Sequence, residues 1–235
     1  MENNQFNMLS AEQIQAEQAS FMSKVYGWMA AALVLTGFTA FFVASTPSLI
    51  VTILENRLFF YALLFGEIAV VWWLTSRLQS MTAGNATMWF FFYAFINGLT
   101  LSVIFIAYTF ESIASTFFIT AGTFGVMSAY GYFTKKDLSS WGSILFMGLI
   151  GVIIAGVVNI FWQNNLFGMV ISSIGVLIFV GLTAYDTQKI KALNIIGNEG
   201  TDEDRKEAIL GALTLYLDFI NLFLFLLRLL GGRRN

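Results

Sequence analysis

From Val25 to its end, the chain alternates long apolar runs with short polar breaks. Each run is close to the ~20 residues that a helix needs to cross ~30 Å of hydrocarbon, so the pattern predicts transmembrane helices. We expect seven spans, at residues 25–44, 58–76, 87–109, 113–133, 142–162, 166–185 and 208–230. The break between the third and fourth spans is the least marked, with Glu111 as its only charge. Without it the two spans would merge into a helix far too long for a bilayer.

Composition supports this interpretation, because 57% of the 235 residues are hydrophobic and only 11% are charged. A soluble domain usually carries about a quarter charged residues. We therefore expect an all-α integral membrane protein with one seven-helix domain at 25–231, a polar cytoplasmic arm at 1–24 and a short basic tail at 232–235. The arm lacks the positive start of a secretory signal.

The chain has neither cysteine nor histidine. This excludes disulfides, thiolate or imidazole metal sites and a histidine pH switch, so proton chemistry must fall to carboxyl groups. The net charge of -2 and the pI near 5.1 argue against a nucleic-acid partner, which needs a basic surface. We expect no cofactor.

The distribution of lysine and arginine predicts a cytoplasmic amino terminus. That side would carry eight basic residues: Lys24, Arg77, Lys135, Lys136, Lys189, Lys191, Arg205 and Lys206. The other side would carry four: Arg57, Arg228, Arg233 and Arg234. Seven spans then put the carboxyl terminus outside, unless the last helix is re-entrant and returns its arginines to the cytoplasm.

Small residues mark faces where helices can approach each other closely. Gly122, Gly125 and Ala129 share one face of the fourth span, and we expect this face to pack against another helix.

Asp218 lies near the middle of the very apolar seventh span. A charged side chain at such a position costs roughly 2.5 to 3.5 kcal/mol, which makes it a candidate functional residue. At 100° per residue, Thr214, Asp218 and Asn221 form one narrow polar stripe. The alternative is a protonated aspartic acid that hydrogen-bonds a neighbouring helix.

Asp186 ends the sixth expected span, three residues before Lys189. Such a carboxylate is either an ordinary interfacial residue or a functional one. If the last two helices bring Asp186 and Asp218 together, the pair shares a proton and titrates as a unit, within about one or two pH units of neutrality. The obstacle is depth, because Asp218 lies nearer mid-membrane unless the sixth helix continues toward Lys191 or the seventh begins later.

Two further charges lie on the second span. Arg77 ends it on the same side as Asp186 and is either a latch for the acidic pair or a positive-inside anchor. Glu67 lies near its middle and either lines an ion path or is protonated and bonded between helices.

Four stretches carry a resemblance to a known family: GLTLSVIFIAYT (98–109), SAYGYFTKKDLSSWG (128–142), FVGLTAYDTQKIK (179–191) and LGALTLYLDFINLFLFLLRLLG (210–231). In these stretches the chain resembles the Bax inhibitor-1, or transmembrane Bax-inhibitor-motif, family, and it looks most like the Gram-negative bacterial branch. The resemblance covers essentially the whole chain from Val25. Its most specific part is the YD pair of the sixth span followed by LYLDFINLF in the seventh.

The resemblance implies a bundle of six helices around the seventh, in a bacterial inner membrane. It also implies a pH-dependent calcium leak controlled by a di-aspartyl pair, to which Asp186 and Asp218 correspond, with Arg77 as the latch. Glu67 matches an acidic position of the ion path, to which the stripe adds Thr214 and Asn221. Calcium binding by the two aspartates would be weak, because a stable site takes about 6 to 8 oxygens.

Two other functions stay open. The first is a non-transporting regulator that binds another membrane protein in quality control or cell survival. The second is an intramembrane aspartyl protease, but that class places Gly-x-Gly before its second aspartate, where this chain has Leu215, Tyr216 and Leu217. We therefore expect no enzyme. The expected partners are calcium ions, protons and the lipid bilayer, and for the regulator a membrane protein.

Overall fold

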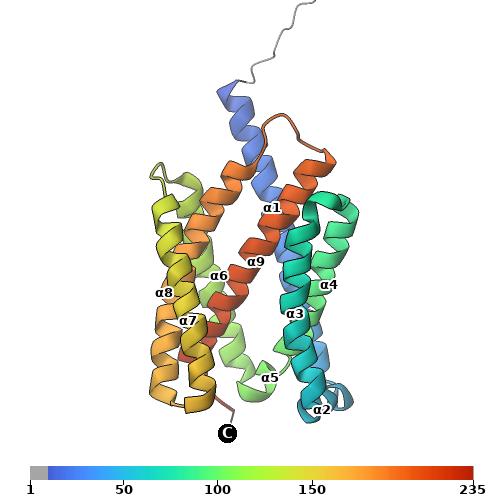
Figure 1. Ribbon diagram of the computed structural model, residues 1–235, viewed down its shortest axis with the longest axis vertical. Helices are drawn as coiled ribbons and strands as arrows, with labels where there is room; N and C mark the ends of the chain where they lie inside the picture. The colour runs from blue at the N-terminus through green and yellow to red at the C-terminus, as the bar shows by residue number, and fades with distance from the viewer. Residues whose placement is uncertain (1–9, 235) are drawn as a thin grey trace, which may run out of the picture.

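The computed structural model describes residues 10–234 as a bundle of helices that run along one long axis (Figure 1). Its elements are α1 (Ala11–Ala44), α2 (Pro47–Glu55), α3 (Arg57–Arg77), η1 (Leu78–Ser80), α4 (Ala83–Leu101), α5 (Ile104–Ala107), α6 (Phe110–Phe133), α7 (Ser139–Trp162), α8 (Asn165–Leu193) and α9 (Asp202–Leu230). Within the described residues, seven helical segments are long and apolar enough to cross a membrane, which confirms the predicted number of spans. Residues 1–9 of the expected arm and Asn235 of the tail lie outside the described residues.

Side-chain caps set where several of these helices begin. Thr82, Thr109, Asn164 and Thr201 each accept a hydrogen bond from the backbone N–H three residues further on. The cap at Thr109 confirms the break after the third span. Between α7 and α8 the chain turns at Gln163, which has a left-handed backbone with φ of 48°.

Three helices are longer than their apolar runs. α1 begins at Ala11 and not at residue 25, so the boundary expected at residue 24 falls inside a continuous helix whose Phe21 and Met22 are buried. α8 continues to Leu193, because Thr187 and Ile190 are still buried against neighbouring helices. α9 begins six residues earlier than expected, at Asp202, with three acidic residues in the first turn that favour a helix start.

α9 is the most buried of the seven spans. Of its most apolar window 67% is buried, compared with 11% for the spans of α3 and α7. It packs against α1, α4, α6 and α8, and it crosses the bundle at a visible tilt (Figure 1). A cavity lies between α9 and α7. The arrangement of all six other helices around α9 therefore stays a prediction.

Close helix contacts occur at glycines other than those expected. Gly131 of α6 lies against the backbone of Ala184, and a Cβ at Gly98 of α4 would be 2.7 Å from Thr39 Cβ of α1. In contrast, a Cβ at Gly122 or Gly125 would meet nothing within 4 Å. The expectation that this face of α6 packs against a helix is wrong, because α6 turns its opposite face toward α8 and α9.

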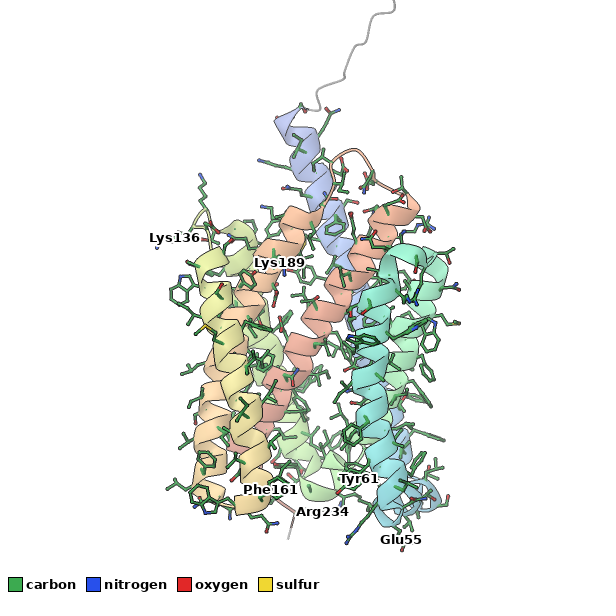
Figure 2. All side chains as sticks on the ribbon, in the orientation of Figure 1. Glu55, Tyr61, Lys136, Phe161, Lys189 and Arg234 are labelled. Atoms are coloured by element: carbon green, nitrogen blue, oxygen red, sulfur yellow. The ribbon has the colours of Figure 1, made fainter. Side chains whose placement is uncertain are left out.

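The lysines of the bundle lie toward one of its ends. Lys136 and Lys189 lie at one end, and Glu55 and Arg234 lie at the other (Figure 2). We call the first the lysine-rich end; it holds the start of α1, the α6–α7 loop and the α8–α9 loop. The amino-terminal end of α1 and the carboxyl-terminal end of α9 lie at opposite ends of the bundle, as an odd number of crossings requires.

Candidate functional site

A cavity of about 780 Å³ lies between α7, α8 and α9, and it contains most of the predicted site residues. Its polar and charged lining consists of Ser143, Tyr185, Asp186, Lys189, Thr214, Asp218, Asn221 and Arg228. Along α8 the lining runs from Ile171 to Lys189, which is about 27 Å at 1.5 Å per residue. That length is comparable to the ~30 Å hydrocarbon core of a bilayer. We call this space the aspartate cavity.

Asp186 and Asp218 both line this cavity, from the adjacent helices α8 and α9. Asp218 is only 5% exposed, and its Oδ2 has no hydrogen-bond partner among residues 10–234. The expectation that Asp186 ends its helix is wrong, since α8 continues for seven more residues to Leu193. This continuation would reduce the predicted difference in depth between the two aspartates, but α9 also begins six residues earlier than expected, at Asp202, so the two shifts nearly cancel.

The polar stripe predicted on the last helix faces the same space. Thr214 and Asn221 line the aspartate cavity together with Asp218. Their side chains are also bonded to their own helix: Thr214 Oγ1 donates to Leu210 O at 3.0 Å, and Asn221 Nδ2 donates to Leu217 O at 2.8 Å. The oxygen of each side chain can therefore still accept a bond or coordinate a cation.

Two basic side chains lie toward opposite ends of the aspartate cavity. Lys189 lies one turn beyond Asp186, and its charge acts on that carboxyl group. The Arg228 guanidinium lies directly against Gly168 and close to Asn159. Among the described residues, neither Lys189 nor Arg228 forms an ion pair. Sequence reasoning did not assign either residue to the site, although Arg228 lies ten positions after Asp218 in an otherwise apolar helix.

Arg77 does not line the aspartate cavity. It lies at the end of α3 in a separate pocket with Trp73 and Trp89, because α3 packs against α4 and not against α8. Its role as a latch stays a prediction.

Glu67 also lies away from the aspartate cavity, in a buried chain of hydrogen bonds. Asn97 Nδ2 donates to Glu67 Oε2 at 3.2 Å, and the Tyr216 hydroxyl donates to Asn97 Oδ1 at 3.2 Å. A 2.7 Å bond joins Tyr216 to Thr36 of α1, whose hydroxyl also lies 2.8 Å from Ala94 O. The chain thus links α3, α4, α9 and α1. Tyr216 was not singled out from the sequence, because a tyrosine in an apolar run carries no sign of its partners.

The aspartate cavity offers few oxygen ligands to a metal ion. No group of three or more acidic, histidine or cysteine side chains that could hold a metal occurs in the described part of the chain. Two carboxyl groups with Thr214 and Asn221 supply fewer oxygens than the ~6 to 8 that calcium takes. A calcium ion here would keep part of its water shell and bind weakly.

Comparison with known proteins agrees with this architecture. Residues 18–235 match the family model described as "Inhibitor of apoptosis-promoting Bax1". The chain belongs to the Bax inhibitor family. It is 49% identical to the inner membrane protein YbhL of Escherichia coli, over 96% of this chain and 97% of the relative. Uncharacterised proteins of Borreliella burgdorferi and Rickettsia prowazekii are 42% and 43% identical over 92% of this chain.

Family membership and the seven spans together make this chain a multi-pass membrane protein. The names of these Bax inhibitor family relatives assign them no enzymatic activity.

Proposed function

We propose that this Bax inhibitor family protein is a pH-dependent calcium leak whose path includes the aspartate cavity. The observation that carries the proposal is the cavity itself, which extends over nearly the hydrocarbon thickness and has the buried Asp218 and the half-buried Asp186 in its wall. Ionisable groups inside membrane spans are rare and costly, and they mark ion and proton paths. The oxygen-rich stripe of α9 suits a hard cation.

Weak binding of calcium in the aspartate cavity would favour its passage across the membrane. A conducting site must bind an ion firmly enough to admit it and loosely enough to release it. Two carboxylates with a few neutral oxygens and retained water provide such a site, whereas a closed cage of oxygens would hold the ion.

The proposed control is the protonation of the pair. Two carboxyl groups at close range do not both ionise cheaply, so the charge of Asp186 and Asp218 changes in coupled steps as the pH changes. Each step changes the attraction of the cavity for a cation and for Lys189, the nearest basic group of the wall. A latch by Arg77 would in addition need the end of α3 to move toward α8.

The proposed orientation puts the lysine-rich end in the cytoplasm. Lysine and arginine accumulate on the cytoplasmic side of membrane proteins. The amino terminus is then cytoplasmic and the carboxyl terminus outside. Calcium would enter past Arg228 and leave past Lys189.

The test is calcium entry into proteoliposomes that contain a trapped calcium indicator, measured from pH 5 to pH 8. Asp218→Asn and Asp186→Asn should each lower the entry rate and flatten its pH dependence. Glu67→Gln is the matched control, because it also neutralises a buried carboxyl group, but one outside the aspartate cavity.

Unchanged entry and unchanged pH dependence in both aspartate variants would refute the path. Wild-type protein that admits no more calcium than empty vesicles would favour a non-transporting regulator.

A further inference from the structure

A second cavity lies apart from the aspartate cavity, in a groove between α1 and α6 near the lysine-rich end. Its volume is about 560 Å³. Its floor is buried and mostly apolar, with Met22, Met29 and Phe124. Its rim consists of small exposed residues: Ala19, Ser23, Gly125 and Ala129. Gly125 and Ala129 of the open α6 face described above form one side of this groove.

The groove has the length of one lipid leaflet. Along α6, within the apolar span of that helix, it runs from Phe124 to Phe133, which is about 14 Å at 1.5 Å per residue. The hydrocarbon core is ~30 Å thick, so one leaflet occupies half of it. A spanning helix of a partner protein would need a groove across both leaflets, whereas one acyl chain needs only this half.

A positive charge lies at the end of the groove where a lipid headgroup would be. Lys191 Nζ donates to Tyr132 O at 3.1 Å and lies 4.4 Å from the centre of the Tyr132 ring, and Tyr132 lines the groove. Lys191 forms no ion pair among residues 10–234. An ammonium group has three donors, so two remain for a phosphate oxygen.

We propose that this groove binds one anionic phospholipid of the leaflet at the lysine-rich end, with an acyl chain between α1 and α6 and its phosphate at Lys191. Basic pockets between membrane helices on the cytoplasmic side bind such headgroups. The bound lipid would cover the floor residues and the glycine face, which α6 leaves without a protein partner. This proposal does not depend on calcium transport.

The groove also explains why lipid binding would matter to the bundle. The Tyr26 hydroxyl, at the groove, hydrogen-bonds Ser128, and Ser128 bonds Thr187 of α8 at 2.9 Å. Thr187 follows Asp186 directly in the chain. An acyl chain that holds α1 and α6 at a fixed spacing would therefore stabilise the contacts that position the Asp186 turn.

The test uses protein reconstituted in nanodiscs with equal amounts of phosphatidylglycerol and phosphatidylcholine that carry the same acyl chains. Lipid retained after transfer to detergent is identified by native mass spectrometry. We expect one phosphatidylglycerol per wild-type monomer, and less of it in Gly125→Leu and Ala129→Leu, which fill the groove. Gly122→Leu is the matched control on the same helix, since it is equally open but does not line the groove.

The headgroup is tested separately. Lys191→Gln should lower phosphatidylglycerol retention about fivefold, the loss expected for one lysine at an anionic membrane surface, while Lys136→Gln should not. Each variant is first checked by gel filtration for a folded monomer, and Lys191 itself is not a lining residue of the groove. Equal retention of the two lipids by wild-type protein, or equal retention by the Gly125→Leu and Gly122→Leu variants, would overturn the proposal. So would a dimer that forms through this face in place of bound lipid.

Discussion

Replacing Tyr216 with phenylalanine tests the hydrogen-bond chain that fastens α9 to α1 and α4. Tyr216 is fully buried, and its ring lies in edge contact with Phe90 and Tyr93 at 5.9 and 5.8 Å between centroids. Phenylalanine keeps these ring contacts and removes only the hydroxyl group. The variant therefore isolates the bonds to Asn97 and Thr36.

The expected loss follows from what the removed hydroxyl leaves behind. Asn97 Oδ1 would lose its hydrogen bond and stay buried, and a buried acceptor without a partner costs about 1 to 3 kcal/mol. The measured contribution of one hydrogen bond between membrane helices to stability is smaller than this cost, about 0.6 kcal/mol on average and up to about 1.7 kcal/mol. Without Tyr216 Oη, Thr36 can donate its single hydroxyl proton to Ala94 O. We expect Tyr216→Phe to lower the free energy of unfolding by about 1 to 2 kcal/mol.

The assay is reversible unfolding in mixed micelles with increasing dodecyl sulfate, followed by circular dichroism. Tyr130→Phe is the control, because Tyr130 of α6 is 46% exposed. A Tyr216→Phe variant as stable as Tyr130→Phe would refute the hydrogen-bond chain. The double variant with Thr36→Val should lose less than the sum of the two single losses, since both remove the same bond.

Two further predictions concern packing and a loop. Gly131→Leu should prevent stable folding, because its side chain would meet the backbone of Ala184, while Gly122→Leu should keep wild-type stability in the same unfolding assay. At the start of α7, the Ser139 side chain and, after it, the Ser139 backbone N–H, which donates to Asp137 Oδ1 at 2.8 Å, lower the pKa of Asp137 from its ordinary value of 3.8. Because the folded-state pKa lies below the ordinary value, this bond contributes at neutral pH and is lost as the pH falls through the folded-state pKa. Hydrogen exchange at the Ser139 amide should therefore lose protection in acid, and Asp137→Asn should show weaker protection already at neutral pH; equal protection in both proteins at neutral pH would contradict this.

The number of spans could be predicted from the sequence, but the ends of several helices could not. Hydropathy reports the part of a helix in hydrocarbon, and α1 and α9 both extend beyond it as polar helices. Their extensions are held by contacts between distant residues: Lys24 Nζ lies 2.8 Å from Asp204 Oδ2, and the Gly200 N–H donates to the same oxygen. No periodic pattern in the chain reveals such a contact.

For the candidate site, too, the sequence predicted which residues share a helix face but not which residues of other helices surround them. Helical spacing alone placed Thr214, Asp218 and Asn221 on one face, and the structure shows that this face lines a cavity. The residues around Arg77 depend on which helix packs beside α3. Tertiary packing decides which helices are neighbours, so the sequence of α3 alone does not predict it. The partner of Glu67 is Asn97 on the next span, so two polar residues in consecutive apolar runs were the available signal.

The central claim is that calcium passes through the aspartate cavity, and a single introduced thiol tests it most directly. The chain has no cysteine, so Thr214→Cys carries one reactive group, in the wall of the cavity. Val126→Cys on the exposed face of α6, which is 68% exposed, is the control. Calcium entry into proteoliposomes is measured for each variant before and after reaction with a cationic methanethiosulfonate reagent. The proposal predicts that modification at position 214 stops most of the entry and that modification at position 126 leaves it unchanged; complete modification at position 214 with undiminished entry would contradict it.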